Sequence, residues 1–257
     1  MKEDPLLIVD SLSHAFKNQR PVLQSLSFSL MPGEILGLIG GSGCGKTTLA
    51  HLILQLLPIQ RGSIHFQGRA VSRPTIKSRR KQARHLQAIF QDPVSSLNPR
   101  MKVESLIQEP FHIHRLPHSS VDIHKLMSSV HLPTSYLSRY PHQLSGGERQ
   151  RIAIARSLAL KPTLLLCDEP LSSLDYVIQY EILELFRELH TLHNITYLFI
   201  SHDLQTLAQF ATRCLVLHEG QIVDEGTFSS LYTSPKHPYT HSLLNSLPQP
   251  TPPPVNA

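Results

Sequence analysis

The first residues that could do chemistry form a glycine-rich segment, residues 40–47, which reads Gly-Gly-Ser-Gly-Cys-Gly-Lys-Thr. It satisfies the phosphate-loop pattern G-x-x-x-x-G-K-[ST] between an expected strand and an expected helix. Its glycines let successive N–H groups face a phosphate, and the following helix directs the positive end of its dipole there. We expect Lys46 to reach the β- and γ-phosphates of a nucleotide and Thr47 to give a hydroxyl to Mg²⁺. The residues expected to contact the nucleotide here are Gly40, Gly41, Ser42, Gly43, Cys44, Gly45, Lys46, Thr47 and Thr48.

A second candidate is an apolar run that ends in two carboxylates, residues 164–169, Leu-Leu-Leu-Cys-Asp-Glu. A buried strand of this kind brings acidic side chains to the edge of a sheet where phosphates bind. We expect Asp168 to hold Mg²⁺ and Glu169 to position or deprotonate the attacking water. The alternatives are a glycine turn without a ligand and a solvated acidic pair, and the two segments together disfavour both.

These two segments indicate only a phosphate-loop NTPase, a class that includes kinases, helicases and GTPases. A third segment, residues 144–151, reads Leu-Ser-Gly-Gly-Glu-Arg-Gln-Arg and closely resembles the signature motif of the ABC ATPase family. With residues 152–159 the resemblance covers nearly the whole chain. It implies an α/β P-loop NTPase with a RecA-like core, an antiparallel β subdomain and an inserted helical subdomain. Without it, the two glycines could simply be a helix start and its preceding turn.

In that family two ATPase domains meet head to tail, and each ATP lies between the phosphate loop of one domain and the signature of the other. The resemblance therefore implies that Ser145, Gly146 and Gly147 bind the nucleotide of a partner. A serine and two glycines that open a helix also leave bare N–H groups for an anion. Because the chain carries one set of motifs, we expect a second ATPase subunit, with ATP and Mg²⁺ as cofactors.

The resemblance assigns further residues by their positions. Gln91 corresponds to the glutamine that senses Mg²⁺ and water and couples to the membrane subunits, and Asp175 to the loop that crosses to the partner site. His202 corresponds to the switch histidine near the γ-phosphate. Phe16 is expected to stack on adenine, with an ordinary packed phenylalanine as the alternative. Catalytic roles are thus expected for Glu169, His202, Lys46 and Gln91, and contacts with Mg²⁺ for Thr47, Gln91 and Asp168.

Residues 90–101 and 234–244 resemble the dipeptide, oligopeptide and nickel importer subfamily. Residues 140–143 and 167–170 look like the second of its two ATPase subunits, which implies a heterodimer with a nonidentical ATPase. The resemblance implies import of peptides, or of nickel or a related small solute. It also implies two transmembrane permease subunits, an indirect extracytoplasmic solute-binding protein, no nucleic acid, and a peripheral place on the cytoplasmic face of the inner membrane.

The chain departs from the family pattern at Glu148, where glutamine is common, at Thr47, where serine is commoner, and at Leu171 and Tyr176. None of these departures removes a required chemical group. Many relatives continue past the Pro-Tyr-Thr segment with a cysteine-bearing extension that can hold an iron–sulfur cluster. This chain stops at Ala257 without one, and we expect no cluster.

The elements that must position these residues alternate between β-rich runs and helical patterns. No strand pattern occurs between Gln91 and Lys161, so we expect a helical subdomain at about 92–160, inserted in an ABC ATPase domain at 1–246. Residues 247–257 include five prolines and are expected to form a disordered tail. Strands are expected at 6–9, 22–30, 35–39, 63–66, 86–90, 163–167, 196–200, 214–217 and 221–224, and helices at 46–57, 103–112, 121–132 and 148–160.

The composition, 257 residues with 40% apolar content, suits one large domain. The net charge of +5 is spread out, and the one basic cluster, residues 77–81, is interpreted as a solvated loop rather than a nucleic-acid patch. Three cysteines without paired spacing support neither disulfides nor a zinc site. The acidic amino terminus does not resemble a signal peptide, and every apolar run is far shorter than the roughly 20 residues of a membrane span. We expect His112, His114 and His118 to be solvated rather than to bind metal.

The sequence disfavours two other functions. A soluble ABC ATPase acting on ribosomes or DNA is the main alternative. Such translation factors usually join two cassettes in one chain, and DNA-associated relatives insert long coiled coils, whereas this chain has one cassette and no sustained heptad. A nucleotide-binding module without hydrolysis is disfavoured by Glu169 and His202.

Overall fold

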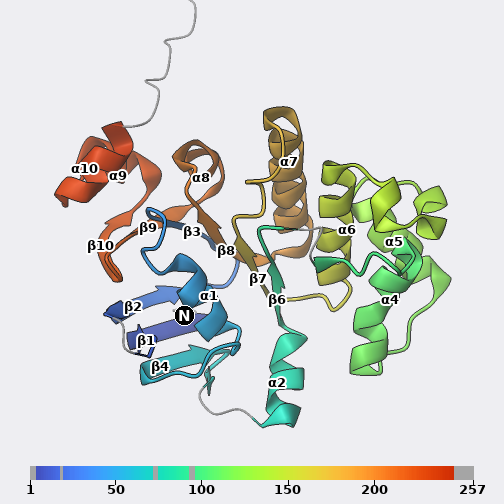
Figure 1. Ribbon diagram of the computed structural model, residues 1–257, viewed down its shortest axis with the longest axis horizontal. Helices are drawn as coiled ribbons and strands as arrows, with labels where there is room; N and C mark the ends of the chain where they lie inside the picture. The colour runs from blue at the N-terminus through green and yellow to red at the C-terminus, as the bar shows by residue number, and fades with distance from the viewer. Residues whose placement is uncertain (1–3, 18–19, 72–74, 93–95, 246–257) are drawn as a thin grey trace, which may run out of the picture.

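A computed structural model of the chain describes residues 4–17, 20–71, 75–92 and 96–245. Its centre is a six-stranded sheet in the order β10-β9-β3-β8-β7-β6, which is parallel except for β10 (Figure 1). The strands of this sheet are β3 (Ile35–Ile39), β6 (Leu86–Ile89), β7 (Leu164–Asp168), β8 (Thr196–Ser201), β9 (Arg213–His218) and β10 (Gln221–Gly226). Every residue of β3, β7 and β8 is buried, as expected for a parallel sheet covered on both faces.

A second, antiparallel sheet in the order β2-β1-β4-β5 packs on one face of the central sheet. Its strands are β1 (Leu7–Ala15), β2 (Pro21–Leu30), β4 (Arg61–Phe66) and β5 (Arg69–Ala70). The helices are α1 (Lys46–Ile53), α2 (Ile76–Ala83), α4 (Val103–His114), α5 (Ser120–Ser129), α6 (Gly146–Leu158), α7 (Tyr176–His193), α8 (Leu204–Phe210), α9 (Phe228–Thr233) and α10 (Pro238–Asn245). Leu36 and Leu38 of β3 join the apolar residues of α1 and of the antiparallel sheet in one buried cluster. The cluster fixes the start of α1 against β3.

The opposite face of the central sheet is covered by α7 and α8. Ile35 and Ile39 belong to the buried cluster on that side, because successive side chains of a strand point to opposite faces. Phe186 of α7 meets Tyr197 and Phe199 of β8 edge-on, with ring centroids 5.7 Å apart in both pairs. Such contacts hold α7 firmly on β8 and so position the loops at the carboxyl ends of the strands.

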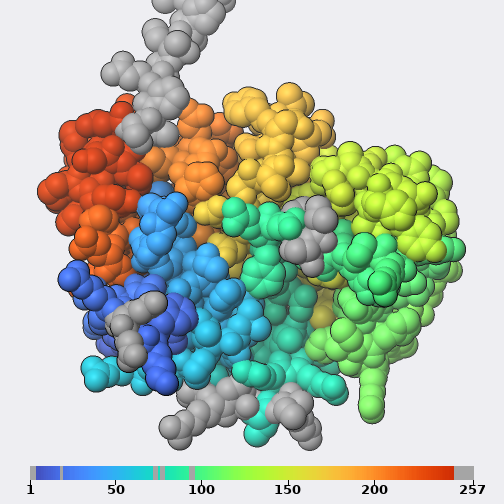
Figure 2. Space-filling view, in the orientation of Figure 1, coloured from blue at the N-terminus to red at the C-terminus, as the bar shows by residue number. Residues whose placement is uncertain are grey.

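Helices α4, α5 and α6 form a group beside β6 and α7, drawn in green and yellow in Figure 1 and visible as a lobe in Figure 2. Val103, Leu106 and Ile152 are fully buried where these helices pack together. The residues described between Gln91 and Lys161 contain no strand, as the sequence predicts.

The expected elements are found, with boundary shifts of a few residues, as where α5 ends at Ser129 rather than at residue 132, and with three larger differences in extent or type. Strand β1 runs to Ala15 because it continues past a bulge at Ser11, whose φ is 50°. Helix α1 ends at Ile53, four residues early, because Gln55 adopts a left-handed φ of 59°. Residues 77–81 were expected to form a loop, and this was wrong: they lie in α2. Lysine, arginine, glutamine and alanine are strong helix formers, and no glycine or proline interrupts that segment.

Two expectations concern the membrane and the carboxyl terminus. Among the residues the structure describes, no helix is long and apolar enough to cross a membrane. The tail predicted at 247–257 lies outside the described residues.

Candidate nucleotide site

The phosphate loop connects β3 to α1 at the carboxyl edge of the central sheet. Gly45 caps α1 with a left-handed φ of 110°, and a Cβ there would lie 2.7 Å from Leu23 and 2.9 Å from the Val22 carbonyl. A Cβ on Gly40 would lie 2.4 Å from the Leu217 carbonyl oxygen. Only glycine fits at these two positions, so the backbone can curl back toward the start of α1.

Lys46 is the first residue of α1 and is only 6% exposed. Its Nζ donates hydrogen bonds to the carbonyl oxygens of Gly40 at 2.8 Å and Gly41 at 2.9 Å. The ammonium group is therefore held inside the loop by two neutral acceptors. A phosphate oxygen is a stronger, charged acceptor, so a bound nucleotide can draw the ammonium group away from them.

Asp168, the last residue of β7, supplies the acidic oxygens next to this loop. It is 5% exposed, and burial raises the pKa of its carboxyl group against the opposing effect of a hydrogen bond from Thr47. Its Oδ1 atom has no hydrogen-bond partner among the described residues. A buried carboxylate oxygen without a donor, beside a threonine hydroxyl, suits a hard cation such as Mg²⁺ that takes oxygen ligands.

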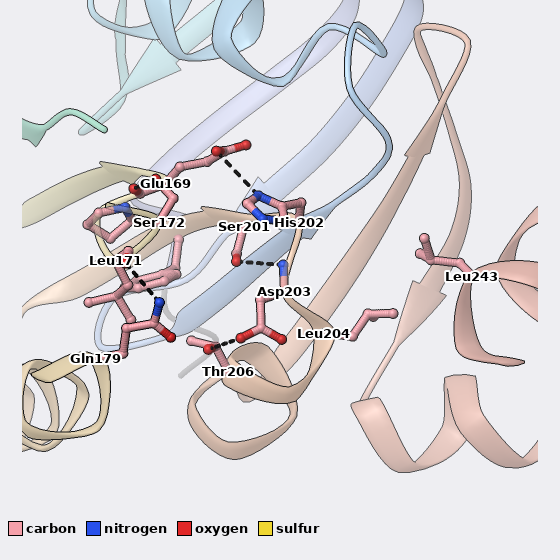
Figure 3. Close-up of a pocket in the computed structure, with 12 residues that line it drawn as sticks. Glu169, Leu171, Ser172, Gln179, Ser201, His202, Asp203, Leu204, Thr206 and Leu243 are labelled. Atoms are coloured by element: carbon pink, nitrogen blue, oxygen red, sulfur yellow. Dashed lines mark hydrogen bonds and ion pairs between the residues drawn. The ribbon is translucent and has the colours of Figure 1, made fainter. Parts of the chain in front are cut away.

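Glu169 and His202 face each other at the ends of the neighbouring strands β7 and β8 (Figure 3). His202 Nδ1 lies 3.3 Å from Glu169 Oε2, and the two side chains are 58% and 20% exposed. Glu169 has a left-handed φ of 50°, and its N–H donates to the Ile200 carbonyl at 2.9 Å. A non-glycine residue in that conformation is strained, and the hydrogen bond to β8 holds the backbone there. The contact with His202 then holds the carboxylate at the end of the sheet rather than between its strands. The side chain can still reach a water molecule.

A cavity of about 420 Å³ lies beside this pair. It is lined by the segment after β7, the start of α8 and Leu243 of α10, as Figure 3 shows. Asp203 closes one side by accepting a hydrogen bond from the Gln205 N–H at 2.8 Å, which caps α8. The Glu169 and His202 side chains therefore line a cavity with room for several water molecules rather than lying in the packed core.

Two other expected residues lie at the same edge of the sheet. Gln91 is exposed and follows β6, whose Ile89 pairs with Cys167 of β7. Asp175 caps α7, and its Oδ1 accepts the N–H of Ile178 at 3.1 Å. The fold thus gathers the loop, both carboxylates, His202 and Gln91 at one edge.

The signature segment does not lie beside the phosphate loop of the same chain. Its helix α6 is separated from α1 by β6 and α7 (Figure 1). Ser145 caps α6: its hydroxyl accepts the Glu148 N–H at 3.3 Å, and Glu148 Oε2 accepts the Ser145 N–H at 2.7 Å. Tyr136 donates to the other Glu148 oxygen at 2.9 Å. These hydrogen bonds, led by the one from Ser145, hold the pKa of Glu148 below its ordinary value. The glutamate at this position therefore locks the start of the signature helix.

Gly147 is where α6 approaches α7. A Cβ on it would lie 2.6 Å from Cγ2 of Ile178. We expect Gly147→Ala to destabilise the chain by about 1–2 kcal/mol in urea unfolding, because overpacking outweighs the better helix propensity of alanine. Combined with Ile178→Ala, the loss should be smaller than the sum of the single variants.

Gly146→Ala is the matched control, since its Cβ would meet Leu174 at an ordinary 3.5 Å. Equal free energies of unfolding for the two alanine variants would show that the packing of α6 on α7 does not require glycine at position 147.

Phe16 follows β1 and is 40% exposed. Its ring meets His14 edge-on with centroids 5.1 Å apart, and its exposure shows that it is not an ordinary packed core residue. An exposed ring face is what stacking on a base requires.

The histidine cluster differs in part from expectation. His112 is exposed, but His118 is half-buried and stacks on Phe111 with ring centroids 4.9 Å apart. Burial lowers the pKa of His114, helped by Arg84 and Arg80. These rings pack rather than being wholly solvated, and no metal-binding group of three side chains occurs in the described parts of the chain.

Two contacts at the site were not predicted from the sequence. Gln150 of α6, fully buried, donates to the Pro170 carbonyl at 2.8 Å and so ties the signature helix to the residue after Glu169. Tyr239 of α10 accepts the N–H of Gly41 at 2.8 Å. Both join segments far apart in sequence, and no local spacing signals either.

Comparison with known proteins places the sequence in one family. Residues 23–172 match the family model described as ABC transporter. The chain is 43% identical over 239 residues to the oligopeptide transport ATP-binding protein OppF of Streptococcus mutans, covering 91% of this chain and 78% of that protein. It is 42% identical to the oligopeptide transport ATP-binding protein AppF of Bacillus subtilis, covering 88% and 70%.

Among solved structures, cbiO1 from Clostridium perfringens, part of the ABC transporter complex cbiONQ, has the same fold with a TM-score of 0.80 at 24% identity. The match covers 90% of this chain and 92% of that one. The fold is thus the α/β P-loop NTPase fold of ABC ATPases. With its phosphate loop, paired carboxylates and signature segment, this chain is an ATPase that belongs to the ABC transporter family, in the peptide-importer subfamily.

Proposed function

We propose that the chain hydrolyses ATP to energise the import of dipeptides or oligopeptides across the inner membrane. The observation that carries the proposal is the arrangement at one sheet edge of a lysine-bearing loop, a buried unpartnered carboxylate oxygen and a glutamate–histidine pair. The two relatives named above as oligopeptide transport ATP-binding proteins support peptides as the solute. Nickel or a related small solute is the alternative cargo.

In the proposed site, the loop from Gly40 to Thr48 cradles the phosphates and Lys46 moves from the loop carbonyls onto them. Phe16 stacks on the adenine ring. Thr47, Asp168 and Gln91 would hold Mg²⁺, which supplies neutralisation of the phosphate charge when bound. Glu169 accepts the proton of the attacking water, and His202 orients that carboxylate and stabilises charge near the γ-phosphate.

The proposed site needs a second ATPase, because β6 and α7 lie between the signature helix α6 and the start of α1, where the chain's own phosphate loop ends (Figure 1). In the proposed assembly Ser145, Gly146 and Gly147 bind the partner's nucleotide, and Asp175 contacts it as well. The partner is a nonidentical ATPase, and two transmembrane permease subunits and an extracytoplasmic solute-binding protein complete the importer. The chain then sits on the cytoplasmic face of the inner membrane.

Uptake by cells that lack this chain tests the proposal. Wild-type chain should restore uptake of a radiolabelled tripeptide, and Glu169→Gln should not, although it is present in equal amount. Restoration of radioactive nickel uptake alone would overturn peptides as the solute. Copurification from detergent-solubilised membranes should recover permeases and a second ATPase, whereas recovery with ribosomes or nucleic acid would overturn the transporter role.

A further inference from the structure

The phosphate loop has a contact that its motif does not explain. Gly41, the second residue of the loop, donates its N–H to the hydroxyl oxygen of Tyr239 at 2.8 Å, across 198 positions of sequence. A Cβ built on Gly41 would lie 3.1 Å from that same oxygen. The phenol thus approaches the loop closely enough to restrict what can stand at position 41.

Tyr239 is itself held from three directions. Its ring stacks on His218, the last residue of β9, with centroids 3.8 Å apart and planes at 17°. Its N–H donates to Nδ1 of His237 at 3.1 Å. The turn before it is fixed by Asp224 of β10, a 5% exposed residue whose Oδ2 accepts the N–H groups of Lys236 at 2.8 Å and His237 at 3.3 Å.

The Gly41 peptide connects this anchor to the lysine of the site. Its N–H donates to Tyr239, and the Gly40 carbonyl oxygen of the same peptide unit accepts from Lys46 Nζ at 2.8 Å. Fixing the peptide fixes one of the two acceptors that hold the ammonium group before nucleotide binds. Helix α10 therefore influences the position of the Lys46 ammonium group before nucleotide binds.

We infer that Tyr239 is a positioning residue for ATP binding, whose hydroxyl anchors the phosphate loop to α10 through the Gly41 peptide. The loop keeps its shape for ATP because residues 236–239 are docked on β9 and β10. Tyr239 does not touch the reacting atoms, so the anchor acts on nucleotide affinity more than on the chemical step. By reciprocity, bound nucleotide also favours the docked position of α10.

The test compares full-length wild type with Tyr239→Phe, which keeps the stack on His218 but lacks the acceptor. Titration with a fluorescent ATP analogue and Mg²⁺ should show affinity reduced about three- to tenfold, the range expected for one neutral hydrogen bond. The KM for ATP in the assembled transporter should rise by a similar factor while kcat changes less than about twofold. Tyr232→Phe on the exposed face of α9 is the matched control and should match wild type.

Amide hydrogen exchange without nucleotide separates an anchor from a general structural role. Tyr239→Phe should speed exchange in the peptide containing Gly41 and leave β7 and β8 unchanged. Affinity equal to that of Tyr232→Phe would overturn the inference. So would faster exchange throughout the central sheet, since the loss of affinity would then reflect general destabilisation.

Discussion

Replacing Glu169 with glutamine is expected to leave ATP binding intact and to lower the rate of hydrolysis at least about 100-fold, the usual contribution of a general base. Glutamine has the same shape and can still accept a hydrogen bond from His202, which lies 3.3 Å from the carboxylate. It cannot take a proton from water at neutral pH. Phosphate release by the assembled transporter and equilibrium binding of ATP to the same variant measure the two quantities separately.

Glu181→Gln is the control for this variant, because Glu181 is a half-exposed carboxylate on α7 that pairs with Arg151 of α6, away from the loop. It should hydrolyse ATP at the wild-type rate. Normal turnover in Glu169→Gln would remove Glu169 from the proposed mechanism. Loss of ATP binding would show that the negative charge of Glu169 contributes to binding ATP rather than to the chemical step.

Asp168→Asn is expected to have opposite effects on activity and stability. The rate of Mg²⁺-dependent turnover should fall about 100-fold or more. A bound metal ion stabilises the charge that develops in the transition state by several kcal/mol, and this variant would hold the ion less well. Without nucleotide it should melt at a higher temperature than wild type. Burial raises the pKa of Asp168 in the folded chain, so the ionised carboxylate at neutral pH costs folding free energy that a neutral amide does not. The sign follows because ionisation is easier in the unfolded chain.

Asp10→Asn, at an exposed position on β1, removes the same charge without changing a buried group. Its melting temperature and turnover should both stay near wild type. A lower melting temperature for Asp168→Asn would mean that the hydrogen bond from Thr47 outweighs the cost of burying the charge. Wild-type turnover would remove Asp168 from the metal site.

Much of the fold was predictable because its signals are local. The central strands are unbroken apolar runs and the phosphate loop is a contiguous motif, so β3 and the start of α1 at Lys46 were placed correctly. The extension of β1 past Ser11 was hidden by polar residues around a bulge. The basic segment at 77–81 differs from the predicted loop because its residue types favour a helix more strongly than its charge favours a solvated loop.

The site was predictable only where a motif names a residue. Glu169 and His202 were singled out separately, and only the parallel pairing of β7 with β8 shows that they meet. The contact between Gly41 and Tyr239 has no sequence signature, because the two residues are 198 positions apart and no local spacing links them. The same holds for Gln150 and the Pro170 carbonyl.

The place of β3 in the central sheet has a consequence for the order in which the molecule takes shape during synthesis. Its Ile35 pairs with Tyr197 and its Leu36 with Arg213, so both neighbours of this strand are synthesised long after it. Such long-range parallel pairing makes folding slow and leaves apolar strand edges exposed in the nascent chain. The phosphate loop can therefore take its final shape only after β8 and β9 have been synthesised, and a chain that stops before them would carry the motif without the strands that position it.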